Sequence, residues 1–210
     1  MPVSTKIVPV LESGDRLTRA EFHRRYCERP DIKKAELVEG VVYVASPLRF
    51  DLHAEPDAWA VGWLTAYCAR HPEARVGGNA TVLLDADNEV QPDVCLWRAE
   101  PGGPHLTEDH YVEGAPQLVV EVAASSASYD LHDKMRAYRR NGVLEYVVWR
   151  TLDEAVDWFR LDEGEYVRVE PDARGVIESQ VFPGLRLHVT KLLAGDLAGV
   201  LAELEQPATS

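Results

Sequence analysis

The stretch Gln117-Leu118-Val119-Val120-Glu121-Val122-Ala123-Ala124 is apolar along most of its length and carries one acid, Glu121. Such a run is typical of a β-strand that is covered on both faces of its sheet. An ionised carboxylate there is costly unless a cation, a metal ion or hydrogen bonds receive it. The stretch therefore predicts a buried acid with a dedicated partner. The alternative is an exposed Glu at the end of the strand, solvated or paired with an arginine.

A helix is predicted to follow this strand, from about Tyr129 to Arg140, with Asn141-Gly142 as a left-handed cap. Asp130, Lys134 and Tyr138 recur every four residues and therefore share one face of that helix. Pro92-Asp93 enters another predicted strand. Asp93, Glu121 and Lys134 can thus meet at one edge of a sheet. A simple salt bridge between Lys134 and Asp130 is the alternative role for the lysine.

The remaining pattern alternates helices and strands. Thr18 is expected to cap a helix that starts at Arg19 and stops before Pro30. Residues 35–44 predict two short strands, or one strand bent at Gly40. Further predicted elements are a helix from about Glu55 to Arg70 that does not extend back to His53, strands at 81–84, 90–97 and 143–149, a hairpin at 155–169, and a helix at 191–203.

Length and composition favour one soluble domain. The chain has 210 residues, 46% of them hydrophobic, and no linker or repeat divides it. Residues 1–210 are therefore expected to form a single domain, with its core over about 18–193 and a frayed tail at 206–210. No apolar run is long enough for a signal segment or a membrane span, which predicts a cytoplasmic protein. Cys27, Cys68 and Cys95 are odd in number and widely spaced, and predict buried or incidental free thiols.

The formal net charge of −13 argues against a broad positive surface for nucleic acid. Any site for a polyanion must therefore be local. Basic residues gather around Arg24, Arg25 and Arg29, and again at Arg136, Arg139 and Arg140. Each group is typical of a solvated helix face. The second group shares a helix with Lys134, so some of its arginines are expected to bind a polyanionic substrate beside that lysine while the others point to solvent.

Taken as a set, these residues are recognisable. The motifs Gln91-Pro92-Asp93-Val94, Pro116 to Val122, Ser125, Asp130, Lys134, Tyr138 and Gly142 to Tyr146 resemble the Uma-two family of bacterial endonucleases. That family belongs to the PD-(D/E)XK, or restriction-endonuclease-like, superfamily, and the resemblance covers about Thr18 to Leu193. It implies an α/β fold with a central mixed β-sheet flanked by helices. It also implies magnesium-dependent hydrolysis of phosphodiester bonds in nucleic acid, with DNA as the expected substrate.

The resemblance also implies roles for single residues. Asp93 and Glu121 would bind Mg²⁺, with Mn²⁺ as a substitute, and the main-chain carbonyl of Val122 would be a third ligand. Lys134 would be the catalytic lysine. The superfamily usually carries this lysine two residues after the acid, where the present chain has Ala123, so it must come from the next helix. Carboxylates plus substrate oxygens are the ligands that magnesium prefers.

Two further positions match the family, each with an alternative role. Glu36 corresponds to an acid that could reach the metal through water, and an exposed strand Glu is the alternative. His53 stands where the family often has a histidine that opens a helix, but Pro56 departs from the family pattern. A structural role, as a hydrogen-bonded or surface histidine, is preferred for His53.

Other functions stay open at this stage. A catalytically silent protein could use the same groove to bind a partner, and a metal-dependent hydrolase of a small phosphate ester would keep the same site. A serine nucleophile is disfavoured, because Ser125, Ser126 and Ser128 lie in no GxSxG motif. The sequence does not define an oligomeric state, and a homodimer remains open.

Overall fold

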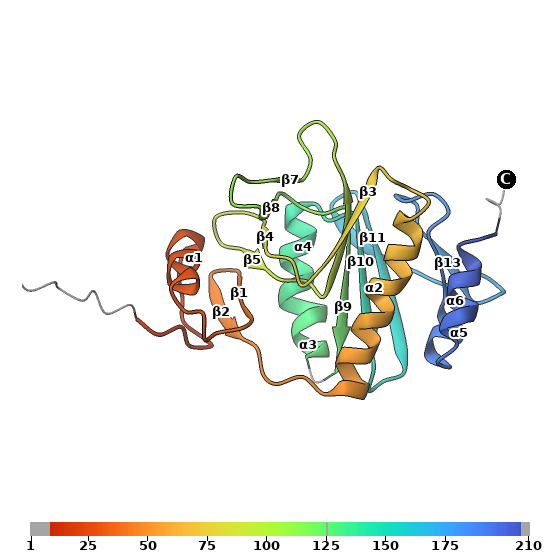
Figure 1. Ribbon diagram of the computed structural model, residues 1–210, viewed down its shortest axis with the longest axis horizontal. Coiled ribbons are helices and arrows are strands. Elements are labelled where there is room, and N and C mark those ends of the chain that lie inside the picture. The colour runs from red at the N-terminus through yellow and green to blue at the C-terminus, as the bar shows by residue number, and fades with distance from the viewer. Residues whose placement is uncertain (1–8, 125, 207–210) are drawn as a thin grey trace, which may run out of the picture.

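The predicted strand around Glu121 lies in the middle of a six-stranded sheet, as the computed structural model of residues 9–124 and 126–206 shows (Figure 1). Ser125 and residues 207–210 of the predicted tail lie outside the described residues. The sheet has the order β12-β11-β10-β9-β6-β3 and is mixed, since β9 pairs parallel with β10 and antiparallel with β6. Its strands are β3 (Ala74–Gly78), β6 (Val94–Arg98), β9 (Leu118–Ala123), β10 (Glu145–Arg150), β11 (Ala155–Asp162) and β12 (Glu165–Val169).

Helices cover both faces of this sheet, which explains the apolar run in β9. Val120 and Val122 share a hydrophobic core with Trp63 of α2 (Glu55–Cys68). Val119 belongs to a second core with Tyr138 of α4 (Met135–Asn141). Because successive side chains of a strand alternate between faces, Glu121 lies on the same face as Val119, toward α4. The prediction of a strand buried on both faces is confirmed.

A second six-stranded sheet packs beside the first and was not predicted. Its order is β2-β1-β5-β4-β8-β7, with β4 and β8 parallel. Its strands are β1 (Ala35–Val38), β2 (Val41–Val44), β4 (Val82–Leu83), β5 (Glu89–Val90), β7 (His105–Leu106) and β8 (Val112–Glu113). Strands β13 (Val176–Glu178) and β14 (Arg186–His188) form a separate pair. The α/β class and the mixed pairing are as expected, but the single central sheet is replaced by two.

Pro92 separates the two sheets. The predicted strand over residues 90–97 is wrong, because β5 ends at Val90 in one sheet and β6 begins at Val94 in the other. Proline has no N–H for a strand ladder, so the chain leaves the second sheet there and enters the first. This break puts Asp93 at the junction of the sheets. The predicted strand pair at 35–44 is confirmed as the hairpin β1–β2, whose turn residues Glu39 and Gly40 both have positive φ.

The helix that follows β9 is interrupted by a wider turn. It runs as α3 (Ala127–Tyr129), a π-helical turn η2 (Asp130–Lys134) and α4, and Gly142 ends it in the left-handed conformation, as predicted. The single helix predicted for residues 191–203 is wrong. Two short helices replace it, α5 (Val189–Leu193) and α6 (Leu197–Glu203), because Gly195 adopts positive φ and Asp196 caps the second helix.

The predicted start of α2 at about Glu55 is confirmed. A π-helical turn that was not predicted, η1 (Phe50–Ala54), precedes α2 and contains His53. Pro56 has no N–H to donate to the carbonyl of Leu52, four residues earlier. That carbonyl instead accepts a hydrogen bond of 2.8 Å from the hydroxyl of Thr151. His53 thus lies outside α2, as predicted, but within a π-helical turn that the sequence did not indicate.

The first helix, α1 (Arg19–Cys27), agrees with its prediction. Its cap is Thr18, whose hydroxyl accepts a hydrogen bond from the N–H of Glu21, and Phe22 is buried against the β1–β2 hairpin. Throughout the described residues, the helices are too short or too polar to cross a bilayer.

Candidate active site

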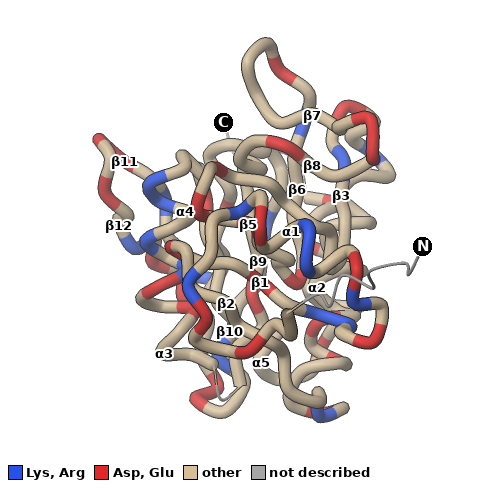
Figure 2. The backbone as a smooth tube through the Cα atoms, turned by 90° about the vertical axis from the view of Figure 1, so that its left-hand side faces the viewer, with Lys and Arg blue, Asp and Glu red and all other residues tan. Residues whose placement is uncertain are grey.

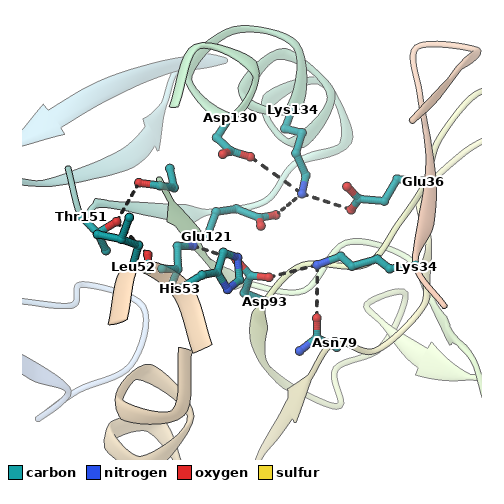
Figure 3. Close-up of polar contacts among 12 residues, drawn as sticks. Lys34, Glu36, Leu52, His53, Asn79, Asp93, Glu121, Asp130, Lys134 and Thr151 are labelled. Atoms are coloured by element: carbon teal, nitrogen blue, oxygen red, sulfur yellow. Dashed lines mark hydrogen bonds and ion pairs between the residues drawn. The ribbon is translucent and has the colours of Figure 1, made fainter. Parts of the chain in front are cut away.

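The predicted catalytic and metal-binding residues meet in one pocket of about 460 Å³ at the junction of the two sheets (Figure 3). The pocket is lined by residues from β1, η1, β9, η2 and the connections next to them. Those that carry charge or were matched to the family are Lys34, Glu36, Arg49, His53, Asp93, Glu121, Val122, Asp130 and Lys134. All of the predicted catalytic and metal-binding residues are therefore in contact with the same space.

Glu121 is the buried acid with a dedicated partner that the sequence predicted. Its Oε1 lies 2.7 Å from Nζ of Lys134 and accepts a hydrogen bond of 2.8 Å from the hydroxyl of Tyr138. Glu121 and Lys134 are each only 2% exposed. The alternative of an exposed or arginine-paired Glu121 is thus wrong. Burial and the neighbouring carboxylates raise the pKa of Glu121 to about 8, although Lys134 opposes them.

Lys134 sits among three carboxylates. Besides Glu121, its Nζ lies 3.1 Å from Oε1 of Glu36 and 3.9 Å from Oδ1 of Asp130. Burial alone would lower the pKa of Lys134, but these three acids outweigh it and raise that pKa well above its ordinary value. The lysine is therefore a fixed positive charge. The salt bridge with Asp130 exists, but it is the longest of the three contacts.

Glu36 is fixed beside this lysine by a second contact. Its Oε1 accepts a hydrogen bond of 2.7 Å from the N–H of Gln91, and only 6% of the residue is exposed. The alternative of an exposed strand Glu is therefore wrong. Because the N–H of Gln91 fixes the same Oε1 that contacts Lys134, Glu36 orients the lysine within the pocket.

Asp93 is held by three groups at the junction of the sheets. Its Oδ1 accepts a hydrogen bond of 3.0 Å from Nζ of Lys34, and its Oδ2 accepts one of 2.8 Å from the N–H of Val122. Nε2 of His53 lies 3.4 Å from the same Oδ2. Burial favours the neutral acid, but His53, Lys34 and Lys134 hold the pKa of Asp93 well below its usual range. Asp93 is therefore ionised.

Lys34 and His53 are pocket residues that sequence reasoning missed or set aside. Lys34 precedes Glu36 by two positions, so strand alternation could have placed both side chains on one side. It also donates a hydrogen bond of 3.2 Å to Oδ1 of Asn79. His53 reaches Asp93 because the π-helical turn η1 extends α2 backward, and its hydrogen bond with Asp93 raises the pKa of His53. No local signal indicated that turn.

The three arginines predicted to bind substrate do not line the pocket. Arg139 pairs with Glu165, and Arg140 lies 2.9 Å from Asp85 and 3.1 Å from Glu39. Arg136 is exposed on α4. Basic and acidic positions are interleaved along the tube in Figure 2. The positive charges nearest the pocket come from other segments, namely Lys34, Arg49 and Lys134.

The oxygen donors of the pocket fit a magnesium ion that keeps much of its water. In the described part of the chain, no three His, Cys, Asp or Glu side chains form a metal site by themselves. Asp93 and Glu121 nonetheless line the same pocket, and the carbonyl of Val122 projects from the strand edge that carries its N–H, toward Asp93. Magnesium is typically bound by one or two carboxylates together with water and substrate oxygens.

Comparisons with known proteins agree with this fold. The chain matches the model of the Uma2 family, described as "Putative restriction endonuclease", over residues 19–190. A crystal structure described as a putative nuclease belonging to DUF820, from Anabaena variabilis ATCC 29413, superposes with a TM-score of 0.62. The two chains are 16% identical, and the match covers 81% of this chain and 96% of the other. At that identity the likeness shows the fold alone. No curated protein matches this chain.

The fold is thus that of an α/β protein, like the solved structure described as a "putative nuclease". Since the family model matches most of the sequence, the chain belongs to the Uma2 family. The resemblance noted in the sequence is confirmed.

Proposed function

We propose that this protein is a magnesium-dependent endonuclease that hydrolyses phosphodiester bonds in nucleic acid, with DNA as its expected substrate. The observation that carries the proposal is the meeting of Asp93, Glu121 and Lys134 in one pocket, although they come from three separate elements. The family description, putative restriction endonuclease, supports the same reaction class.

Asp93, Glu121 and the carbonyl of Val122 are the groups that would hold the cation. A bound Mg²⁺ or Mn²⁺ would supply charge neutralisation at the phosphorus and a water of lowered pKa. The N–H of Val122 and the side chain of His53 keep Asp93 in position for that role. Tyr138 does the same for Glu121, because its hydroxyl donates to Oε1.

Lys134 acts as a cation rather than as a proton acceptor. Its raised pKa keeps the ammonium protonated, so it donates hydrogen bonds and stabilises the negative charge that develops on the phosphoryl oxygens. Glu36 and Asp130 orient the ammonium group of Lys134. Because both acids are buried beside it, they balance its positive charge when no substrate is bound. Removing a positioned donor of this kind costs about 10² to 10³ in turnover in other enzymes.

Substrate contacts come from the pocket lining rather than from α4. Lys34 and Arg49 provide positive charge for a phosphate, and Leu48 and Leu152 are exposed apolar side chains that also line the pocket. Apolar and aromatic surfaces contact nucleobases without regard to sequence. With so few basic groups, binding should be weak and only modestly dependent on salt.

Hydrolysis of a small phosphate ester is the second candidate. The pocket volume of about 460 Å³ lies in the range of small-ligand sites, and none of Arg136, Arg139 and Arg140 contributes to it. A small diester would need only the charges of Lys34, Arg49 and Lys134.

The test is a cleavage assay with Mg²⁺ or Mn²⁺ on duplex DNA, single-stranded DNA, RNA and bis(p-nitrophenyl) phosphate. Asp93→Asn and Glu121→Gln should abolish turnover, and Glu108→Gln, an exposed acid outside the pocket, should not. Turnover of the chromogenic diester without any nucleic-acid cleavage would favour the second candidate. Metal binding without turnover of any substrate would favour a catalytically silent protein.

A further inference from the structure

A second group of reactive side chains lies apart from the pocket lining, where α1 packs on β5. Sγ of Cys27 lies 3.5 Å from Nε2 of His23, and Nδ1 of the same histidine lies 2.9 Å from Oε1 of Glu89. Cys27 is exposed, whereas Glu89 is only 1% exposed. A thiol, an imidazole and a carboxylate therefore form a chain from the surface inward. Of the two alternatives that the sequence left for Cys27, a buried thiol is therefore wrong.

The buried carboxylate fixes the orientation of the imidazole. Both oxygens of Glu89 lie within hydrogen-bond distance of Nδ1, at 2.9 and 3.1 Å, and a carboxylate there favours the tautomer with the proton on Nδ1. Nε2 then faces the thiol as an acceptor. The ring of Tyr111 packs edge-on against His23, with ring centroids 5.2 Å apart. A nucleophile, a base and a group that orients the base are the three parts of an activated nucleophile.

Because of its position on the helix, Cys27 needs the imidazole of His23 for its thiol to be reactive. Cys27 is the last residue of α1, where the negative end of the helix dipole disfavours a thiolate. His23 lies one turn earlier on the same face and offsets this effect when it holds the thiol proton. The thiolate is the nucleophilic form of cysteine, so a paired imidazole is the feature that distinguishes a reactive thiol from an inert one.

We propose that Cys27, His23 and Glu89 form an activated-thiol site that reacts with small hydroperoxides. Nε2 of His23 takes the proton of the thiol, and the sulfur attacks the distal oxygen of the hydroperoxide. The S–O bond forms as the O–O bond breaks, and the leaving oxygen takes the proton from His23. The sulfur is oxidised to a sulfenic acid, and the hydroperoxide is reduced to an alcohol, or to water when it is hydrogen peroxide.

Cys68 serves as an internal comparison. It lies on α2, is partly buried, and burial raises the pKa of its thiol. Cys95 is buried in the core between the sheet and α4, where burial raises the pKa of its thiol to about 12. Both should react slowly with peroxide and with alkylating agents, so labelling of the full chain reports on Cys27.

The experiment follows each cysteine by peptide mass spectrometry, after alkylation with iodoacetamide and after hydrogen peroxide with dimedone trapping. Cys27 should be labelled first, and His23→Gln should slow its alkylation by roughly 100-fold, the lower range for a positioned general base. Glu89→Gln should slow it as well, and Cys68→Ser should leave it unchanged. Because Glu89→Gln alters a buried group, His23→Gln provides the independent comparison. An alkylation rate at Cys27 equal to that of glutathione, or unchanged by His23→Gln, would overturn the assignment.

Discussion

The main-chain N–H of Val122 donates a hydrogen bond of 2.8 Å to Oδ2 of Asp93. The β6–β9 ladder ends at the pair Val94 and Val120, so the carboxylate of Asp93 takes the place that a carbonyl of a longer β6 would occupy. A buried N–H left without an acceptor would be costly. The contact therefore completes the strand edge and fixes Asp93 next to Glu121 at the same time.

Divalent metal should stabilise the protein through this pair. Mg²⁺ or Mn²⁺ at about 100 times its Kd is expected to add about 2.7 kcal/mol to the free energy of unfolding. The double variant Asp93→Asn, Glu121→Gln should lose the response, since it removes both charges while keeping acceptors for Val122 and Tyr138. Thermal denaturation with and without metal measures this, with Glu108→Gln as control. An equal rise in Tm in both proteins would exclude a shared site.

Lys134 should affect turnover more than metal binding. Lys134→Met is expected to lower the cleavage rate by about 10² to 10³. It also leaves three buried acids without their cation, which costs about 3 to 5 kcal/mol of stability. In the double variant Lys134→Met, Glu36→Gln, one of those buried acids is neutral, so the loss of stability should be smaller. A cleavage rate that stays low in this variant reports the loss of the lysine rather than unfolding. Lys134→Arg should rescue poorly, because the planar guanidinium does not match a point charge. Full activity in a folded Lys134→Met protein would contradict a catalytic role for this lysine. Lys33→Met, at an exposed lysine, is the control.

Lys34 should compete with the metal for Asp93. Its Nζ occupies Oδ1 of that carboxylate at 3.0 Å, and a cation bound there must displace it. Lys34→Met is therefore expected to tighten Mn²⁺ binding by about two- to fivefold, which corresponds to the free energy of a partly exposed ion pair. The same substitution should weaken substrate binding. Calorimetric titration with Mn²⁺ and the KM for substrate test the two effects separately. Weaker Mn²⁺ binding in a folded Lys34→Met protein would argue against metal at Asp93.

Thr151 should stabilise the turn that carries His53. Its hydroxyl donates to the Leu52 carbonyl, which cannot accept the usual helical hydrogen bond because Pro56 has no N–H. Thr151→Val keeps the shape but removes the donor, and is expected to cost about 1 kcal/mol. Thr151→Ser keeps the hydroxyl and should cost less. Chemical denaturation compares the two, and equal stability of both variants would show that the Leu52 carbonyl does not need this donor.

The free energy of unfolding should fall with rising pH because Glu145 ionises. Burial raises the pKa of this acid, although hydrogen bonds from Ser179 and the N–H of Gln180 oppose the shift. The folded state therefore holds the proton more tightly than the unfolded chain does. The stabilisation by Glu145 is full below the ordinary Glu pKa of about 4.3 and is lost as the pH rises through the raised pKa of the folded state. Glu145→Gln should flatten this part of the stability profile, measured by denaturation between acidic and neutral pH. A profile of unchanged slope would rule Glu145 out as its source.

Local sequence pattern was enough to define the elements that carry the chemistry. The apolar run around Glu121 determined a strand buried on both faces, because two covered faces demand apolar residues at successive positions. The spacing of Lys134 and Tyr138 determined their shared face, and Gly142 determined where that helix ends. Charge and composition excluded a broad basic surface. Strand burial, helix faces and helix ends depend on residues that are close in the sequence, so they can be predicted from periodicity and from turn residues.

Only the tertiary structure decided which charges face each other. Lys34 and Asp93 are 59 positions apart in the sequence, and no local periodicity encodes their contact. The second sheet is built largely from two-residue strands, which are too short to show an alternation of their own. The π-helical turns that bring in His53 and Lys134 depend on distant partners, such as Thr151 for the Leu52 carbonyl. Backbone conformation is a local preference, but the partner of a buried charge is selected by whichever distant segment packs against it.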